Sequence, residues 1–260
     1  MNSQPRRSLF APQDPPPVSV FNPGGGASFL LLGDHAGNAI PRALGTLGLD
    51  ETERTRHIAW DIGIGALGIA LAETLDAAFI CQAYSRLVVD CNRDPAAPDA
   101  IAEISDGTVI PGNQRLTAQD RAARIAAIHA PYQAAITAEL ARRDAEGGVT
   151  VLVALHSFTP SMGGVDRPWQ IGVLHDGGDV SFAAALLRAL RARGDLEVGD
   201  NQPYAMDATD HTIPRHAYAR RRPYVELEIR QDLLDSPIAV GAWSHLLSGI
   251  FSKALAAGGR

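Results

Sequence analysis

Histidine residues follow two apolar stretches of the chain, and acidic residues lie close to both of them. Asp34 and His35 come directly after the apolar residues 28–33, and His156 comes directly after the apolar residues 149–155. A catalytic zinc ion usually has three nitrogen or oxygen ligands from the protein and one open position for water. A single histidine after a strand is more often a hydrogen-bonded structural residue. Two of them with carboxylates nearby suggest a zinc site, with His35 and His156 as its first two ligands.

The third ligand of such a site is sought at His57 and Asp61, which are four residues apart. On a helix, this spacing places both side chains on one face, where they could hold a metal ion together. Asp61 is the better candidate, because its carboxylate would compensate the charge of the metal. The alternative for Asp61 is a carboxylate on a helix surface. For His57 we favour a half-buried helix histidine over a ligand.

Glu226 and Glu228 alternate with apolar residues in a segment that reads as a strand. In a strand, both carboxylates point to the same face. A carboxylate beside a metal-activated water is the usual general base of amide hydrolysis. A solvent-facing edge strand with Glu–Arg pairing explains the same pattern equally well.

Several basic residues are candidates for binding a substrate carboxylate, because a guanidinium group matches a carboxylate with two parallel hydrogen bonds. Arg93 is the strongest of them, since it directly follows a predicted strand end together with Asn92. For the arginines at 221 and 222, a solvated turn is the favoured alternative. The candidate substrate-binding residues are Asn92, Arg93, Arg86, Arg167 and His216.

The elements that must position these residues alternate between strands and helices. Apolar or β-branched runs predict strands over residues 28–33, 78–82, 86–90, 149–155, 169–174 and 223–229. Helices are predicted over residues 50–75, which three glycines could divide in two, and over residues 117–143, 180–193 and 239–255. Residues 92–113 are predicted to form a long loop. This order predicts an α/β fold, with a mixed, mostly parallel sheet and helices on both faces.

The amino-acid composition argues against several classes of protein. Of the 260 residues, 46% are hydrophobic and 20% are charged, which excludes disorder of the whole chain. The net charge of -6 argues against a nucleic-acid partner, and two cysteines cannot form a disulfide framework. The longest apolar stretch, residues 62–72, is too short to span a membrane. We expect a flexible N-terminal arm over residues 1–26, one domain over residues 27–260, and a cytoplasmic location.

Five segments of the sequence resemble the N-formylglutamate amidohydrolase family, and they occur in the family's order. The segments are residues 34–41 (DHAGNAIP), 57–61 (HIAWD), 85–93 (SRLVVDCNR), 155–157 (LHS) and 226–232 (ELEIRQD). Together they cover about residues 28–235. The resemblance implies a hydrolase fold like that of zinc carboxypeptidases, which the family shares with aspartoacylases.

The resemblance also implies roles for individual residues. By this resemblance His35 and His156 bind zinc, Asn92 and Arg93 contact substrate, and Glu228, which lies in the family's Glu-Ile-Arg segment, is the base. We therefore expect Glu228 and not Glu226 to face the cleft. The carboxypeptidase pattern has a Glu three residues after the first His, where this chain has an Asn at position 38. Asp61 is therefore our expected third ligand.

The function that the resemblance implies is zinc-dependent hydrolysis of the amide bond of an N-acyl amino acid. N-formyl-L-glutamate is the substrate after which the family is named, and it would give glutamate and formate at the end of histidine breakdown. One Zn²⁺ is expected, with another divalent metal ion as an alternative. Two further interpretations stay open: hydrolysis of another small N-acyl or peptide-like substrate, and a catalytically silent homologue that binds a carboxylate. No nucleic-acid or membrane partner is expected.

Overall fold

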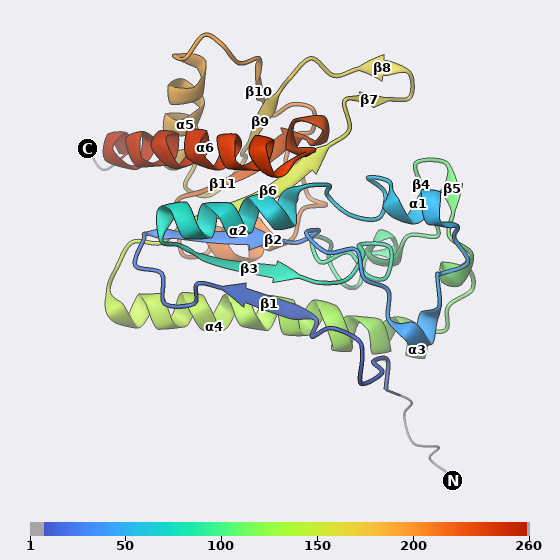
Figure 1. Ribbon diagram of the computed structural model, residues 1–260. Helices are drawn as coiled ribbons and strands as arrows, with labels where there is room; N and C mark the ends of the chain where they lie inside the picture. Colours follow the sequence, from blue (N-terminus) through green and yellow to red (C-terminus); the bar gives the residue numbers. More distant parts are fainter. Residues whose placement is uncertain (1–7, 259–260) are drawn as a thin grey trace.

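A seven-stranded sheet runs through the computed structural model, which describes residues 8–258 (Figure 1). In spatial order its strands are β1 (Val18–Phe21), β3 (Ala78–Gln82), β2 (Phe29–Gly33), β6 (Val151–Phe158), β11 (Tyr224–Arg230), β9 (Ile171–Leu174) and β10 (Val198–Asp200). The four strands from β3 to β11 are parallel to one another. β1 is antiparallel to β3, and β9 is antiparallel to β11. The prediction of a mixed, mostly parallel sheet is confirmed.

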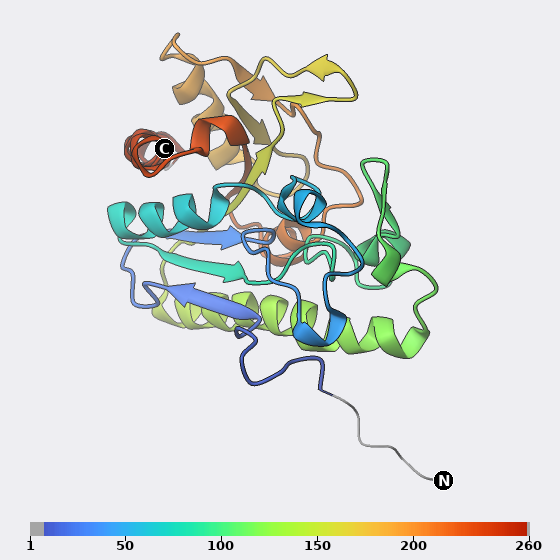
Figure 2. The same ribbon diagram turned by 45° about the vertical axis from the view of Figure 1, so that its right-hand side comes forward.

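Helices cover both faces of the sheet. The three helices α2 (Ile64–Leu75), α5 (Ser181–Arg191) and α6 (Pro237–Gly258) lie on one face (Figures 1 and 2). The helix α4 (Ala130–Glu146) covers the other face. The chain therefore folds as one α/β domain around a single sheet, as predicted.

The apolar strands follow from this two-sided cover, because a strand that is buried on both faces needs apolar residues at every position. In β2, Phe29 and Leu31 pack under the face with α2 and α6, whereas Leu30 and Leu32 pack under the face with α4. β6 alternates in the same way and lies between β2 and β11. This central position explains why residues 149–155 could be recognised as a parallel strand from sequence.

The helix α6 is long and apolar enough to cross a membrane by length and composition alone. In the fold it packs against α2 and α5. Its buried residues Val240, Trp243, Leu247 and Phe251 recur every three or four positions and form one stripe. α6 thus packs as a core helix of this domain.

Two predicted elements differ in the structure. Residues 86–90 are not a strand, because the Ser85 side chain organises a turn there: Ser85 Oγ donates to Ala59 O at 2.7 Å and accepts from Leu87 N at 3.2 Å. Residues 50–75 form two helices, α1 (Glu51–Thr55) and α2, with residues 56–63 between them. Gly63 precedes α2 with φ +86°, a conformation that favours glycine.

The predicted helix over residues 117–143 is present, with one irregularity. It begins as α3 (Ala118–Arg124), passes through a π-helical turn (Ile125–His129) and continues as α4. Thr117 and Asp120 form a capping box at its start. Pro131 has no N–H to continue the regular hydrogen bonds, which accounts for the wider turn before it.

Several short elements were not predicted. Residues 18–21 form the edge strand β1, so the expectation of a poorly ordered arm does not hold for them, whereas residues 1–7 lie outside the described residues. β10 was also missed. Two small hairpins were missed as well: β4 (Ile104–Ser105) with β5 (Thr108–Val109), and β7 (Ser161–Met162) with β8 (Val165–Asp166).

The contact between α2 and β3 can be tested at Gly68, where a Cβ atom would collide with the buried ring of Phe79. We expect Gly68→Ala to lower the free energy of unfolding by about 1–3 kcal/mol, through overpacking. Gly241→Ala in α6 is the matched control, because a Cβ there meets nothing within 4 Å. It should raise the free energy of unfolding by about 0.5–1 kcal/mol, through helix propensity. Urea denaturation of both variants measures the difference, and equal effects would contradict the packing.

Candidate active site

The carboxyl ends of the parallel strands meet at one edge of the sheet, where a cavity of about 460 Å³ opens. Asp34 and His35 follow β2, and His156 lies near the end of the adjacent strand β6. Glu228 on β11 pairs directly with His156 in the strand register. His35, His156 and Glu228 all line the cavity. Sheet topology therefore collects groups that are nearly 200 residues apart in the sequence.

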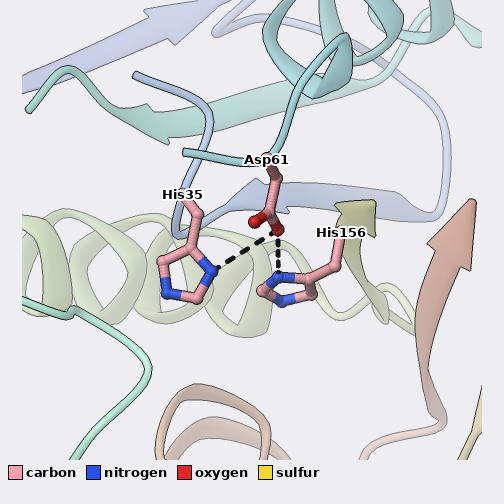
Figure 3. A group of neighbouring side chains, drawn as sticks. All are labelled: His35, Asp61 and His156. Carbon is pink, nitrogen blue, oxygen red and sulfur yellow. Dashed lines mark hydrogen bonds and ion pairs between the residues drawn. The ribbon is translucent and has the colours of Figure 1, made fainter. Parts of the chain in front are cut away.

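His35, Asp61 and His156 converge at this edge. One ligand atom from each lies within 4.8 Å of the other two, and all three residues are buried. Asp61 Oδ2 is 3.4 Å from His35 Nδ1 and 2.9 Å from His156 Nδ1 (Figure 3). The centres of the two imidazole rings are 5.0 Å apart. The prediction that these three side chains come within reach of one metal ion is confirmed.

Asp61 reaches the site through backbone tethers rather than through a helix face. It lies in the break between α1 and α2, where its N–H donates to His35 O at 2.9 Å. Asp61 therefore joins the group from an irregular segment, and the helical spacing of His57 and Asp61 is not what places it there. His57 Nε2 lies 3.5 Å from Asp106 Oδ2, outside the group. Asn38 is also turned away, because its Nδ2 donates to Arg54 O at 2.7 Å.

A carboxylate lies beside the far nitrogen of each imidazole. His35 Nε2 is 2.7 Å from Asp90 Oδ1, and His156 Nε2 is 3.5 Å from Asp34 Oδ2. The first contact is a hydrogen bond, which fixes the orientation of the imidazole and leaves its Nδ1 for the metal, whereas the second is an ion-pair contact without a hydrogen bond. Asp34 Oδ1 in turn accepts from Thr212 Oγ1 at 2.5 Å. In the sequence, Asp34 and Asp90 lie at the ends of predicted strands, but no role was predicted for either. The position of Asp34 directly before His35 was the signal that could have indicated its role beside an imidazole.

The donor set fits a divalent metal ion. His35 Nδ1 is buried and has no hydrogen-bond partner within the described residues. Burial raises the pKa of Asp61, but the two neighbouring imidazoles lower it more, so the carboxylate is held ionised. Five carboxylates are buried around the group, and such charge is costly without a cation. They are Asp34, Asp61, Asp90, Glu226 and Glu228.

Glu226 and Glu228 are both buried and both line the cavity. β11 lies inside the sheet between β6 and β9, so the alternative of a solvent-facing edge strand is wrong. The expectation that Glu228 alone faces the cleft is also wrong. Burial raises the pKa of each carboxyl group to about 8.

Three of the candidate substrate-binding residues line the cavity but already have protein partners. Arg86 Nη2 is 2.7 Å from Asp90 Oδ2. Arg93 Nε is 3.2 Å from Asp99 Oδ2. Asn92 Oδ1 accepts from the backbone N–H groups of residues 211 and 212 at 3.0 and 2.9 Å. These side chains hold the walls of the cavity together.

Arg167 differs from the other two arginines because it has no carboxylate within 4 Å among residues 8–258. Its Nη1 donates to the hydroxyl of Tyr204 at 2.9 Å, and its guanidinium carbon lies 4.8 Å from the centre of that ring. Tyr204 lines the cavity. Arg167 is not itself among the residues that line the cavity, but it packs against Tyr204, which does, and its positive charge acts on Glu228.

His216 does not belong to the site. Its Nε2 lies 2.6 Å from Gln133 Oε1, its side chain is buried and does not line the cavity, and burial lowers its pKa to about 4. The structure therefore does not support the expectation that His216 contacts substrate. Of the arginines at 220–222, Arg222 pairs with Asp144 at 2.5 Å, away from the cavity.

Comparison of the sequence and the structure with known proteins identifies a matching family and similar crystal structures. The sequence profile of the N-formylglutamate amidohydrolases matches residues 27–234. A gene product of Agrobacterium tumefaciens has a crystal structure with a TM-score of 0.94 and 36% identity, covering 97% of this chain and 100% of that chain. An N-formylglutamate amidohydrolase from Ralstonia eutropha has a TM-score of 0.64 and 20% identity, covering 91% of this chain and 96% of that chain. No curated protein matches the sequence.

The ligand set can be tested by metal analysis of dialysed protein. Asp61→Ala and His156→Ala should each lose the bound metal ion, because two ligands hold a divalent ion far less tightly than three. His57→Ala is the control and should keep the metal content of the unaltered protein, since His57 lies outside the group. An unchanged metal content in Asp61→Ala would remove Asp61 from the ligand set.

Proposed function

Because the chain belongs to the N-formylglutamate amidohydrolase family, whose members are hydrolases acting on an amide bond, we propose that it is a zinc-dependent hydrolase of N-acyl amino acids. The observation that carries this proposal is the group His35, Asp61 and His156 with Glu228 in the same cavity. N-formyl-L-glutamate, the namesake of the family, is the first substrate to assay. The cytoplasm and histidine degradation are the expected setting.

The imidazoles of His35 and His156 and the carboxylate of Asp61 would hold the zinc ion. When bound, zinc would lower the pKa of a water molecule to about 7 and polarise the scissile carbonyl. Asp90 keeps the imidazole of His35 in the orientation that presents Nδ1, and Asp34 lies beside the far nitrogen of His156. Nitrogen and carboxylate ligands suit zinc and other divalent ions, so metal analysis of the purified protein decides the identity.

Glu228 is the proposed general base. Its carboxyl group lies next to His156 across the strand pair β6–β11, on the cavity side. It would accept a proton from the attacking water and later donate it to the leaving nitrogen, so that the acid and the free amine are released. Burial raises its pKa to about 8, which favours the donation, and a bound divalent cation would lower that pKa so that the carboxylate is available to accept the proton near neutral pH.

Two arginines are proposed to contact substrate. Arg167 would bind the α-carboxylate of the amino acid, since it has no carboxylate partner of its own within residues 8–258. Arg93 Nη2 forms no hydrogen bond within the described residues, so it can donate to the scissile carbonyl. Arg86 and Asn92 would keep the ligand group and the adjoining loop in place.

Replacement of the base gives the most direct test. Glu228→Gln should lower kcat by at least about a hundredfold, because Gln cannot accept the proton. The metal content should stay that of the unaltered protein, since Glu228 lies outside the ligand group. Turnover of N-acyl amino acids by the zinc-loaded enzyme and metal analysis are the two measurements. Full turnover in this variant would exclude Glu228 as the base. Metal binding without turnover of any N-acyl amino acid by the unaltered protein would identify a silent homologue.

The role of Arg167 predicts a dependence on the substrate carboxylate. Arg167→Gln should raise KM about tenfold or more for an N-acyl amino acid, the value of one charged hydrogen-bonded contact. The same substrate with an amidated carboxyl group is the control, because it offers Arg167 no charge. It should be a poor substrate for both proteins, with little difference between them. Equal losses on the acid and the amide would assign Arg167 to the structure of the cavity wall instead.

A further inference from the structure

The cavity is strongly acidic. Eight Asp and Glu side chains line it, against two arginines. Both arginines already pair with carboxylates, Arg86 with Asp90 and Asp61 and Arg93 with Asp99 and Asp210, and the free Nη2 of Arg93 is assigned above to the scissile carbonyl. A divalent ion at the His35 group would offset only part of the negative charge. The lining therefore disfavours a substrate that brings two carboxylates, because Arg167 is positioned to accept one of them and no lining arginine is left for the other.

Glu226 is the residue that the proposed reaction leaves unused. It lies two residues before Glu228 on β11 and on the same face of the strand, so it is deeper in the cavity. Only 3% of its surface is exposed, and its Oε2 has no hydrogen-bond partner within residues 8–258. A buried carboxyl group without a partner is costly. Such a group, directed into a cavity, indicates a cationic donor that binds there.

Asp210 supplies a second carboxylate near this position. It lines the same cavity, and its negative charge acts on Glu226. The loop around it is fixed, because Asp207 N donates to Asp210 Oδ2 at 2.9 Å and Asn92 Nδ2 donates to Oδ1 at 3.3 Å. Glu226 and Asp210 thus face the cavity from a rigid strand and from an anchored loop.

We propose that Glu226 and Asp210 form a subsite for the ammonium or guanidinium group of a basic side chain. The substrate is then an N-acyl derivative of a basic amino acid rather than of a dicarboxylic one. Arg167 receives its α-carboxylate, and the acidic end of the cavity receives its side chain. This assignment rests on the proposed amidohydrolase function and narrows its substrate class.

The test compares three substrates of similar size with the zinc-loaded full chain: Nα-formyl-L-lysine, Nα-formyl-L-norleucine and N-formyl-L-glutamate. We expect kcat/KM for the lysine substrate to exceed that for norleucine by at least about tenfold, the value of one charged hydrogen bond. Glu226→Gln should bring this ratio close to one while metal content is kept. Asp207→Asn is the matched control. It removes an exposed charge from the same cavity, its side-chain oxygen can still accept from Thr209 N, and the ratio should change less than about twofold.

A binding measurement separates this inference from the proposed function, because it needs no turnover. Calorimetry with free L-lysine, L-norleucine and L-glutamate should show the tightest binding for lysine, and Glu226→Gln should remove the preference. Turnover of N-formyl-L-glutamate in preference to the lysine substrate would overturn the subsite and leave the amidohydrolase function standing. Lysine-selective binding without hydrolysis would support the subsite and overturn the function. Two metal ions per chain, falling to one in Glu226→Gln, would assign the acidic end to a second metal and also overturn the subsite.

Discussion

The position of one carboxylate, that of Asp61 between two imidazoles, is the constraint on which the site depends. The side chain could not reach this place from a regular helix. The chain leaves α1, passes through residues 56–63 and re-enters a helix only after Gly63, while the backbone of Asp61 is bound to that of His35. The parallel pairing of β2 and β6 brings the two histidines to the same level, and the loop between the helices adds the acid. The topology of the sheet thus positions the two histidines of the ligand group, and one irregular segment positions Asp61.

The strands and helices of this fold could be predicted where burial on both faces leaves an unmistakable pattern. The apolar runs that became β2 and β6 are of this kind, and so is the stripe of α6. Residues 86–90 have the same composition as a strand, but a hydroxyl side chain before them satisfies the backbone locally and favours a turn. β1 has only four residues and lies at the sheet edge, where pairing with β3 rather than any local pattern determines it. Pairing between strands that are distant in the sequence cannot be predicted from a short segment of it.

The residues of the candidate site differ in how far the sequence alone could predict their roles. His35, His156 and Glu228 could be predicted as site residues from their places in the predicted strands and from the resemblance. The positions of Asp34 and Asp90 beside the imidazole nitrogens are visible only in the structure. Arg93 looked like a free cation in the sequence, yet it is paired with Asp99. Glu226 looked equivalent to Glu228, and Oε2 of each has no partner within the described residues; what distinguishes them is the strand register, which places Glu228 opposite His156 and Glu226 opposite Ala154. Pairing between charges is a property of the folded chain, so residue types alone could not reveal which charges are available.

The hydrogen bonds of Thr212 connect the two ends of the cavity. Thr212 Oγ1 donates to Asp34, which lies beside the imidazole of His156, and Thr212 N donates to Asn92, which also holds Asp210. A loop tied in this way to a ligating imidazole makes metal and ligand affinities thermodynamically linked, and linkage is reciprocal. Occupation of either end should change binding at the other by the same factor. The segment 207–212 is therefore the place where sequence drift among relatives would alter metal retention and ligand preference together.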